Sequence, residues 1–131
     1  MKQLIFFLVF STTLIYSYGQ TQSEMNEKAA KDFEKADKEL NSVFQQIIKE
    51  YRSDTVFIKN LRKAQKLWIQ LRDAELDVKF PEEPDKFYGS VAPMCWSMYK
   101  IDLTKERIKK LRVWLIGIKE GDVCAGSVKI I

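Results

Sequence analysis

The sequence has no histidine among its 131 residues, so it lacks the side chain most used for acid–base chemistry near neutral pH. A Ser–His–Asp triad, a Cys–His pair and a histidine metal site are therefore excluded. The two cysteines, Cys95 and Cys124, cannot form a closed structural zinc site without histidine. Paired carboxylates could do the work of a glycosidase, but no pattern brings two of them into one cleft. We predict no catalytic residue, no metal site and no cofactor.

Five polar residues have types and spacing that could form a site, namely Asp37, Gln65, Arg72, Asp73 and Arg107. Asp37, Arg72 and Arg107 fall on or beside predicted apolar stripes. Helix bundles often secure their register with hydrogen-bonded ion pairs at such positions. We therefore predict that these residues form a structural clamp, with contact to a ligand as the alternative.

Three helices must position these residues. Apolar residues recur at steps of three and four over 21–52, over a second segment after Ser53-Asp54, and over 91–118. Neither Gly nor Pro occurs between residues 20 and 80, so only a short turn separates the first two helices. The second helix is expected to bury a seam of apolar side chains: Phe57, Leu61, Ala64, Trp68, Leu71 and Val78.

The fold class is predicted as all-α, a small three-helix antiparallel bundle whose third helix is bent if Thr104 caps a break. Residues 81–90, PEEPDKFYGS, carry two of the three prolines and form the one clear loop. We expect Trp68, Trp96 and Trp114 to lie in the core rather than on a binding platform.

The N-terminus has the layout of a secretory signal peptide. Lys2 precedes an apolar run, and the small residues Ser17 and Gly19 flank a plausible cleavage before Gln20. We therefore predict a signal peptide at 1–19, a helical domain at 20–118 and a C-terminal tail at 119–131. The protein is expected to be exported, periplasmic or secreted, with no integral membrane span after processing. Loss of Lys2 lowers the net charge from +4 by one.

Short polar motifs follow one another along the chain: TQSEMN at 21–26, ADKELN at 36–41, AQKLWI at 64–69, RDAE at 72–75, GS at 89–90, then Cys95, LTKER at 103–107 and Leu111. In order and spacing they resemble the lysozyme-inhibitor LprI-like family of bacterial exported proteins, over about residues 21–115. The resemblance implies a small, exported, all-α domain. Some members of that family are linked with inhibition of host-type lysozyme.

The cysteines depart from the family pattern. Relatives usually carry cysteines at the positions of Lys28 and Leu76, and another just before the Thr-Gln pair, which could meet the one matching Cys95. A straight helix from Cys95 to residue 118 is about 34 Å long, at 1.5 Å per residue. Six extended residues then reach back only about 20 Å, and disulfide Cα atoms must come within about 7 Å. The geometry does not favour a Cys95–Cys124 bond, although a bend near Thr104 would marginally permit one.

The uneven distribution of charge along the sequence supports two different functional hypotheses. Residues 81–99 carry three acids, Glu82, Glu83 and Asp85, against one lysine, whereas residues 100–119 carry seven bases against two acids. The first hypothesis is a non-enzymatic protein that binds a partner protein, a lysozyme, by placing the acidic loop with Phe87 and Tyr88 in the sugar cleft. The positive net charge opposes approach to a cationic enzyme.

The second hypothesis is binding to an anionic envelope surface through the basic third helix. Its alternative is that this basic face is simply solvated. Export disfavours nucleic acid as a partner.

Overall fold

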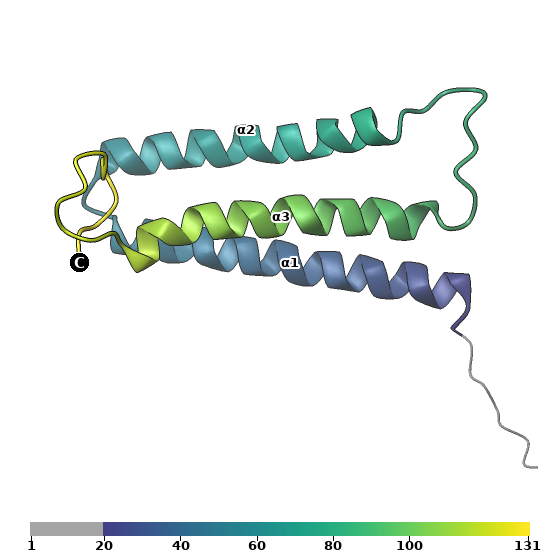
Figure 1. Cartoon of the computed structure of the whole chain (residues 1–131), viewed down its shortest axis with the longest axis horizontal. Helices are drawn as coiled ribbons and strands as arrows, with labels where there is room; N and C mark the ends of the chain where they lie inside the picture. The colour runs from purple at the N-terminus through teal and green to yellow at the C-terminus, as the bar shows by residue number, and fades with distance from the viewer. Residues whose placement is uncertain (1–19) are drawn as a thin grey trace, which may run out of the picture.

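A computed structural model describes residues 20–131, and the predicted signal peptide at 1–19 lies outside the described residues. The described chain forms three helices, α1 (Gln22–Glu50), α2 (Thr55–Lys79) and α3 (Ala92–Ile116). Because the chain turns back twice, α1 and α3 run parallel and α2 runs opposite to both (Figure 1). α1 packs along α3, while α2 contacts α3 more than α1. The predicted all-α three-helix bundle is confirmed.

Local sequence chemistry sets the helix ends. The Thr21 hydroxyl accepts a hydrogen bond from the Glu24 backbone N–H, and the Thr21 N–H donates to the Glu24 carboxylate, which forms a capping box. Asp54 accepts from the Phe57 N–H at 2.9 Å and so caps α2. α3 ends at Gly117, whose φ of 87° favours glycine.

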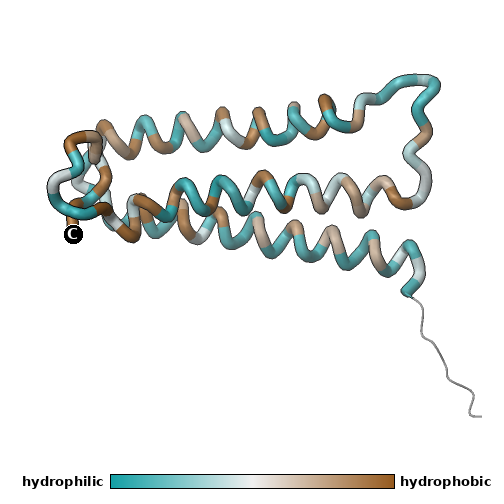
Figure 2. The backbone as a smooth tube through the Cα atoms, viewed as in Figure 1, coloured by the Kyte–Doolittle hydropathy of each residue, from teal (hydrophilic) through white to brown (hydrophobic). Residues whose placement is uncertain are grey.

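The apolar core lies nearer the α1–α2 turn than the loop end. Apolar residues recur along each helix between hydrophilic ones, as Figure 2 shows. The buried apolar cluster draws on all three helices: Leu40, Val43, Ile47, Leu61, Ile108 and Leu111. Its small size means that polar contacts must hold much of α2 in place.

The buried face of α2 differs from the predicted seam. Leu71 and Val78 are 55% and 81% exposed, whereas Gln65 and Arg72 are buried. The expectation was wrong because apolar spacing selected Leu71, while its polar neighbour faces the bundle. α2 therefore meets the other helices through polar as well as apolar side chains.

Thr104 does not interrupt the third helix. α3 is continuous from Ala92 to Ile116, and Thr104 lies fully buried within it. Its small side chain points into the bundle rather than capping a break, so the predicted bend is not present.

The C-terminal tail packs back on the end of the bundle. The Ile118 N–H donates to the Lys129 carbonyl, and the Ile131 N–H donates to the Ile118 carbonyl. The Tyr51 hydroxyl donates to the Trp114 carbonyl at 2.9 Å and accepts from the Lys129 N–H at 3.0 Å. The tail is thus tied to both α1 and α3.

The two cysteines are far apart and unbonded. Cys95 is half-buried in the first turns of α3, and Cys124 is exposed in the tail at the opposite end of the bundle. The length of α3 separates them.

Candidate functional site

The loop at residues 81–90 is fastened at both ends. The Tyr88 hydroxyl donates to the Pro81 carbonyl at 2.8 Å, which closes the loop on itself. The Tyr88 ring packs edge-on against Phe80, with centroids 5.7 Å apart. Asn26 of α1 donates its side-chain N–H to the Ser90 carbonyl at 2.8 Å. These contacts hold the base of the loop against both α1 and the end of α2.

The tip of the loop projects into solvent. Glu82, Glu83 and Asp85 are exposed, and the Phe87 ring is 95% exposed. A turn closes the tip, because the Lys86 N–H donates to the Glu83 carbonyl and the Lys86 ammonium pairs with the Glu83 carboxylate at 3.0 Å. The loop therefore presents three carboxylates and an aromatic ring on a folded protrusion.

A hollow of about 580 Å³ opens behind this tip. The loop forms one side of it, and the ends of α2 and α3 form the other. Trp96 lines the hollow and is 37% exposed, so its predicted place in the core is wrong. Trp68 and Trp114, by contrast, pack against the core. The loop, the hollow and Trp96 together form an acidic and aromatic end of the molecule.

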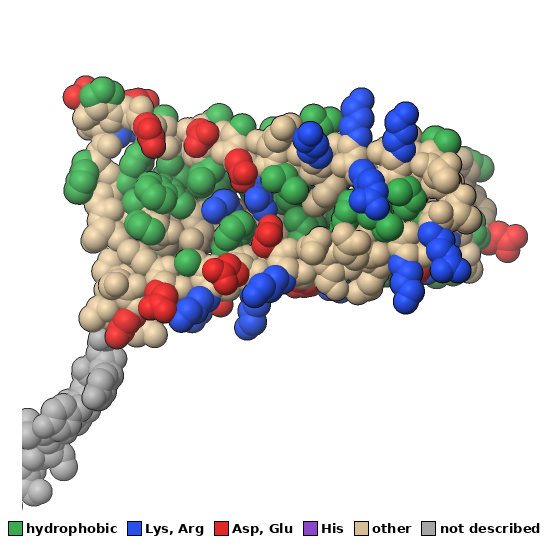
Figure 3. All heavy atoms as spheres, turned by 180° about the vertical axis from the view of Figure 1, so that it is seen from behind, with side chains coloured by type: hydrophobic (Ala, Val, Ile, Leu, Met, Phe, Trp, Pro, Cys, Tyr) green, Lys and Arg blue, Asp and Glu red, His purple; other side chains and the backbone are tan. Residues whose placement is uncertain are grey.

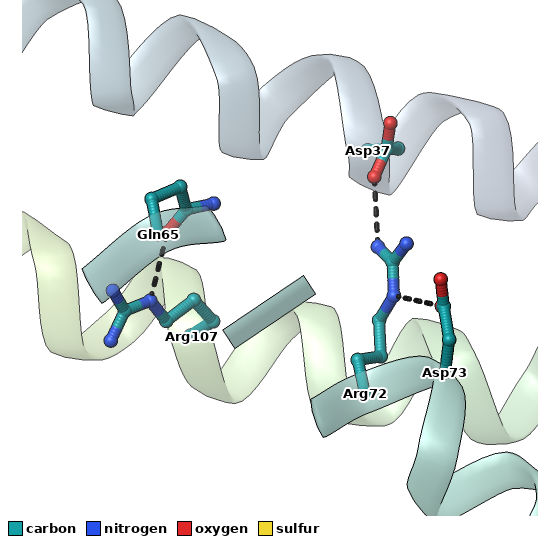
Figure 4. Close-up of polar contacts among 5 residues, drawn as sticks. All are labelled: Asp37, Gln65, Arg72, Asp73 and Arg107. Carbon is teal, nitrogen blue, oxygen red and sulfur yellow. Dashed lines mark hydrogen bonds and ion pairs between the residues drawn. The ribbon is translucent and has the colours of Figure 1, made fainter. Parts of the chain in front are cut away.

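The five polar residues separate into two groups, as Figure 4 shows. Arg72 donates to Asp37 at 2.9 Å and to Asp73 at 3.1 Å. Arg107 instead donates through Nε to the Gln65 side-chain oxygen at 3.0 Å. The first group joins α1 to α2 and the second joins α2 to α3, so neither lies in the loop region.

Cations and aromatic rings alternate through the centre of the bundle. Arg72 lies 5.2 Å from the Phe33 ring centroid and 5.3 Å from that of Trp68. Lys100 lies 4.2 Å from Phe33, and Arg107 lies 5.7 Å from Trp68. Cation–π attraction favours these arrangements. This stack accounts for the polar residues on the buried face of α2.

Charge is divided between the two ends. The region nearest the loop, residues 20–37 and 72–100, contains eleven acidic and seven basic residues and is called the acidic half. The region nearest the tail, residues 38–71 and 101–131, contains seven acidic and fourteen basic residues and is called the basic half. Figure 3 shows acidic side chains gathered towards the loop end and basic ones towards the other. The small positive net charge is therefore the sum of −4 in the acidic half and +7 in the basic half.

Two exposed carboxylates on α1 belong to the acidic half. A hydrogen bond from Lys31 lowers the pKa of Glu27, and one from Lys28 lowers the pKa of Asp32. Both groups therefore stay ionised to lower pH than an unpaired carboxylate would.

Residues 20–131 contain no group of three or more potential metal ligands. None of the described helices is both long and apolar enough to cross a membrane.

The fold and the site define a small helical bundle that presents a folded, acidic and aromatic loop at one end. Residues 16–111 match the family described as Lysozyme inhibitor LprI, and the chain belongs to this family. Comparisons with curated proteins and with solved structures gave no match.

Sequence reasoning missed several residues that build the site. Asn26 is 64 positions from its partner Ser90, and no local pattern links the two. Trp96 was expected in the core because its spacing fits a helix face. Trp96 lies only six residues after the end of the loop, and this proximity could have indicated a position beside the loop.

Proposed function

We propose that this protein inhibits a lysozyme by inserting the 81–90 loop into the sugar-binding cleft. The observation that carries the proposal is the fastened loop, with Glu82, Glu83, Asp85 and the exposed Phe87 ring at its tip. Membership of the LprI family supports lysozyme as the partner. The protein acts here as a binding protein and not as an enzyme.

The loop has the mechanical properties that cleft occlusion needs. A protrusion that is already folded loses little conformational entropy on binding. The Tyr88–Pro81 and Asn26–Ser90 hydrogen bonds fold it before any partner arrives. An exposed aromatic ring can then fill a desolvated pocket, the usual place for a binding hot spot.

The division of charge removes the electrostatic objection to this partner. A lysozyme of positive charge would be repelled by the protein's net charge at long range. The loop nevertheless lies in the acidic half, which has net charge −4. Screening limits interactions between exposed charges to about 8 Å at physiological ionic strength. A cationic lysozyme that approaches the loop therefore meets mainly acidic residues.

A turnover assay with a c-type lysozyme and bacterial cell walls tests the proposal. We define the loop variant as Glu82→Gln/Glu83→Gln/Asp85→Asn. Equimolar wild-type protein should suppress lysis, and both the loop variant and Phe87→Ala should inhibit at least about tenfold less well.

A matched variant controls for net charge. The control variant, Asp102→Asn/Glu106→Gln/Glu120→Gln, removes three exposed acids from the basic half. It should inhibit as well as the wild type. Undiminished lysis in a molar excess of wild-type protein, or equal loss in the loop and control variants, would contradict the proposal.

A second candidate function is binding to an anionic envelope surface. The basic half, with net charge +7, favours it. On α3 itself, however, Arg107 donates to Gln65 and Arg112 pairs with Glu39 at 2.6 Å. Salt-sensitive sedimentation with anionic vesicles would support this function, and equal sedimentation with neutral vesicles would oppose it.

A further inference from the structure

Arg107 is a half-buried cation with no carboxylate partner among the described residues. Its Nε donates to the neutral Gln65 side chain, and no ion pair of Arg107 is formed. Arg72, which lies over the same Trp68 ring, has two carboxylates on its guanidinium. Burial lowers the pKa of Arg107, and no neighbouring charge opposes that effect. The hydrogen bond to Gln65 and the contact with the Trp68 ring leave the charge of Arg107 unneutralised, so an anion that reached it would form charge-assisted hydrogen bonds.

Arg107 also lines a hollow between α2 and α3 at the tail end of the bundle. The hollow measures about 460 Å³, within the range of small-molecule sites. Its walls are mostly apolar and include Leu61 and Leu111, with the Phe57 and Trp114 rings 6.1 Å apart. It lies at the opposite end from the acidic loop.

The polar groups around this hollow limit what it can hold. Asp54 lines it too, but its carboxylate accepts the Phe57 N–H and caps α2. Asn60 and Ser127 add neutral polar atoms, and Ser127 accepts a hydrogen bond from the Trp114 ring N–H at 3.0 Å. Arg107 is thus the one cation among the described residues that line this mostly apolar space, and it lies in the basic half, which has net charge +7.

We propose that this hollow binds a monocarboxylate with an aliphatic body, such as a medium-chain fatty acid. The carboxylate would accept hydrogen bonds from the terminal nitrogens of Arg107, whose Nε is already held by Gln65. The aliphatic chain would lie between the apolar faces of α2 and α3, against Leu61, Leu111 and Trp114.

Titration calorimetry with dodecanoate below its micellar concentration tests the proposal, with dodecanol as the uncharged analogue. Wild-type protein should bind one dodecanoate, and should bind dodecanol at least about tenfold more weakly because the charge-assisted hydrogen bonds are lost. Quenching of tryptophan fluorescence should follow the same isotherm. Equal affinity for the two probes, or no binding of dodecanoate, would overturn the proposal.

Two variants separate binding from folding. Arg107→Gln should weaken dodecanoate binding to the level of dodecanol. Because Arg107 also joins α2 to α3, Ala64→Trp provides an independent test: Ala64 is exposed at the rim of the hollow, and an indole there would fill it. It should abolish binding while Arg107 stays in place. Arg112→Gln, on the same helix but outside the hollow, should bind like wild type. Unchanged binding in Ala64→Trp would exclude this site.

Discussion

Arg72 and its carboxylate partners contribute unequally to stability because their burial differs. The Arg72 side chain is 9% exposed, whereas Asp37 and Asp73 are 53% and 59% exposed. Arg72 also lies between the Phe33 and Trp68 rings. Most of its contribution therefore comes from packing and cation–π contact rather than from either ion pair.

Arg72→Ala should accordingly lower the free energy of unfolding by about 2–3 kcal/mol, since it removes the buried stem and both ring contacts. Asp37→Asn should cost no more than about 1 kcal/mol, because a half-exposed ion pair is screened and Asp73 remains. Urea denaturation followed by circular dichroism measures both. Equal losses in the two variants would show that the Asp37–Arg72 ion pair is the dominant contact.

Thr104 contains the one buried side-chain polar atom within residues 20–131 that lacks a hydrogen-bond partner. The residue is fully buried in α3. Thr104→Val replaces the hydroxyl with a methyl group and should stabilise the protein by about 1 kcal/mol. Thr104→Ser keeps the hydroxyl but loses a methyl group, and should destabilise it by about 1 kcal/mol. Thermal denaturation of the two variants compares them, and a less stable Thr104→Val protein would mean that the hydroxyl has a partner.

At the scale of the elements, the sequence predicts the helices better than their contacts. Apolar steps of three and four place both ends of the first and third helices within two residues of their observed positions. The buried face of α2 was misplaced because Arg72, rather than Leu71, faces the bundle. That choice depends on the Phe33 and Trp68 rings, which only the register of separate helices brings together.

The contacts of the loop could likewise not be predicted from the sequence. Its prolines, acids and glycine mark it clearly in the sequence as a loop. Its folded shape depends on a hydrogen bond between Asn26 and Ser90, which are brought together only when α1 and α3 pack. The acidic and aromatic composition of the candidate site could therefore be predicted, but not its fastening or the hollow beside it.

The junction of α3 and the tail offers a test of packing at the element scale. Gly117 and Gly121 both have positive φ, of 87° and 96°. A Cβ on Gly117 would lie 2.7 Å from an Ile131 methyl carbon and 2.9 Å from the Lys129 carbonyl oxygen, whereas one on Gly121 meets nothing within 4 Å.

Both alanine variants should lose about 1 kcal/mol from backbone strain. Gly117→Ala should lose more and release the tail, because Ile131 and Lys129 must move. Limited proteolysis of the C-terminus, alongside thermal denaturation, distinguishes the two. Equal protease resistance in Gly117→Ala and Gly121→Ala would argue that the tail does not depend on this close approach.

At the scale of the whole molecule, the division of charge gives an electrostatic test of the proposed function. α1 has 29 residues and therefore spans about 43 Å, at 1.5 Å per residue. The Debye length at 0.1 M salt is about 10 Å. A partner at the loop therefore lies several Debye lengths from the far part of the basic half, and the net charge of the whole protein does not govern its approach.

The sign of the salt dependence shows whether the net charge of the protein or the acidic half governs association with a lysozyme. If the net positive charge governed encounter with a cationic lysozyme, added salt would screen repulsion and raise the association rate. If the acidic loop half governs it, as we expect, raising salt from about 0.1 to 0.5 M should lower the rate several-fold, because salt screens attraction. Surface plasmon resonance measures the rate directly.

The loop variant should lose much of this salt dependence and the control variant should keep it, although each removes three negative charges. A rate that rises with salt, or the same slope in both variants, would place the contact away from the acidic end.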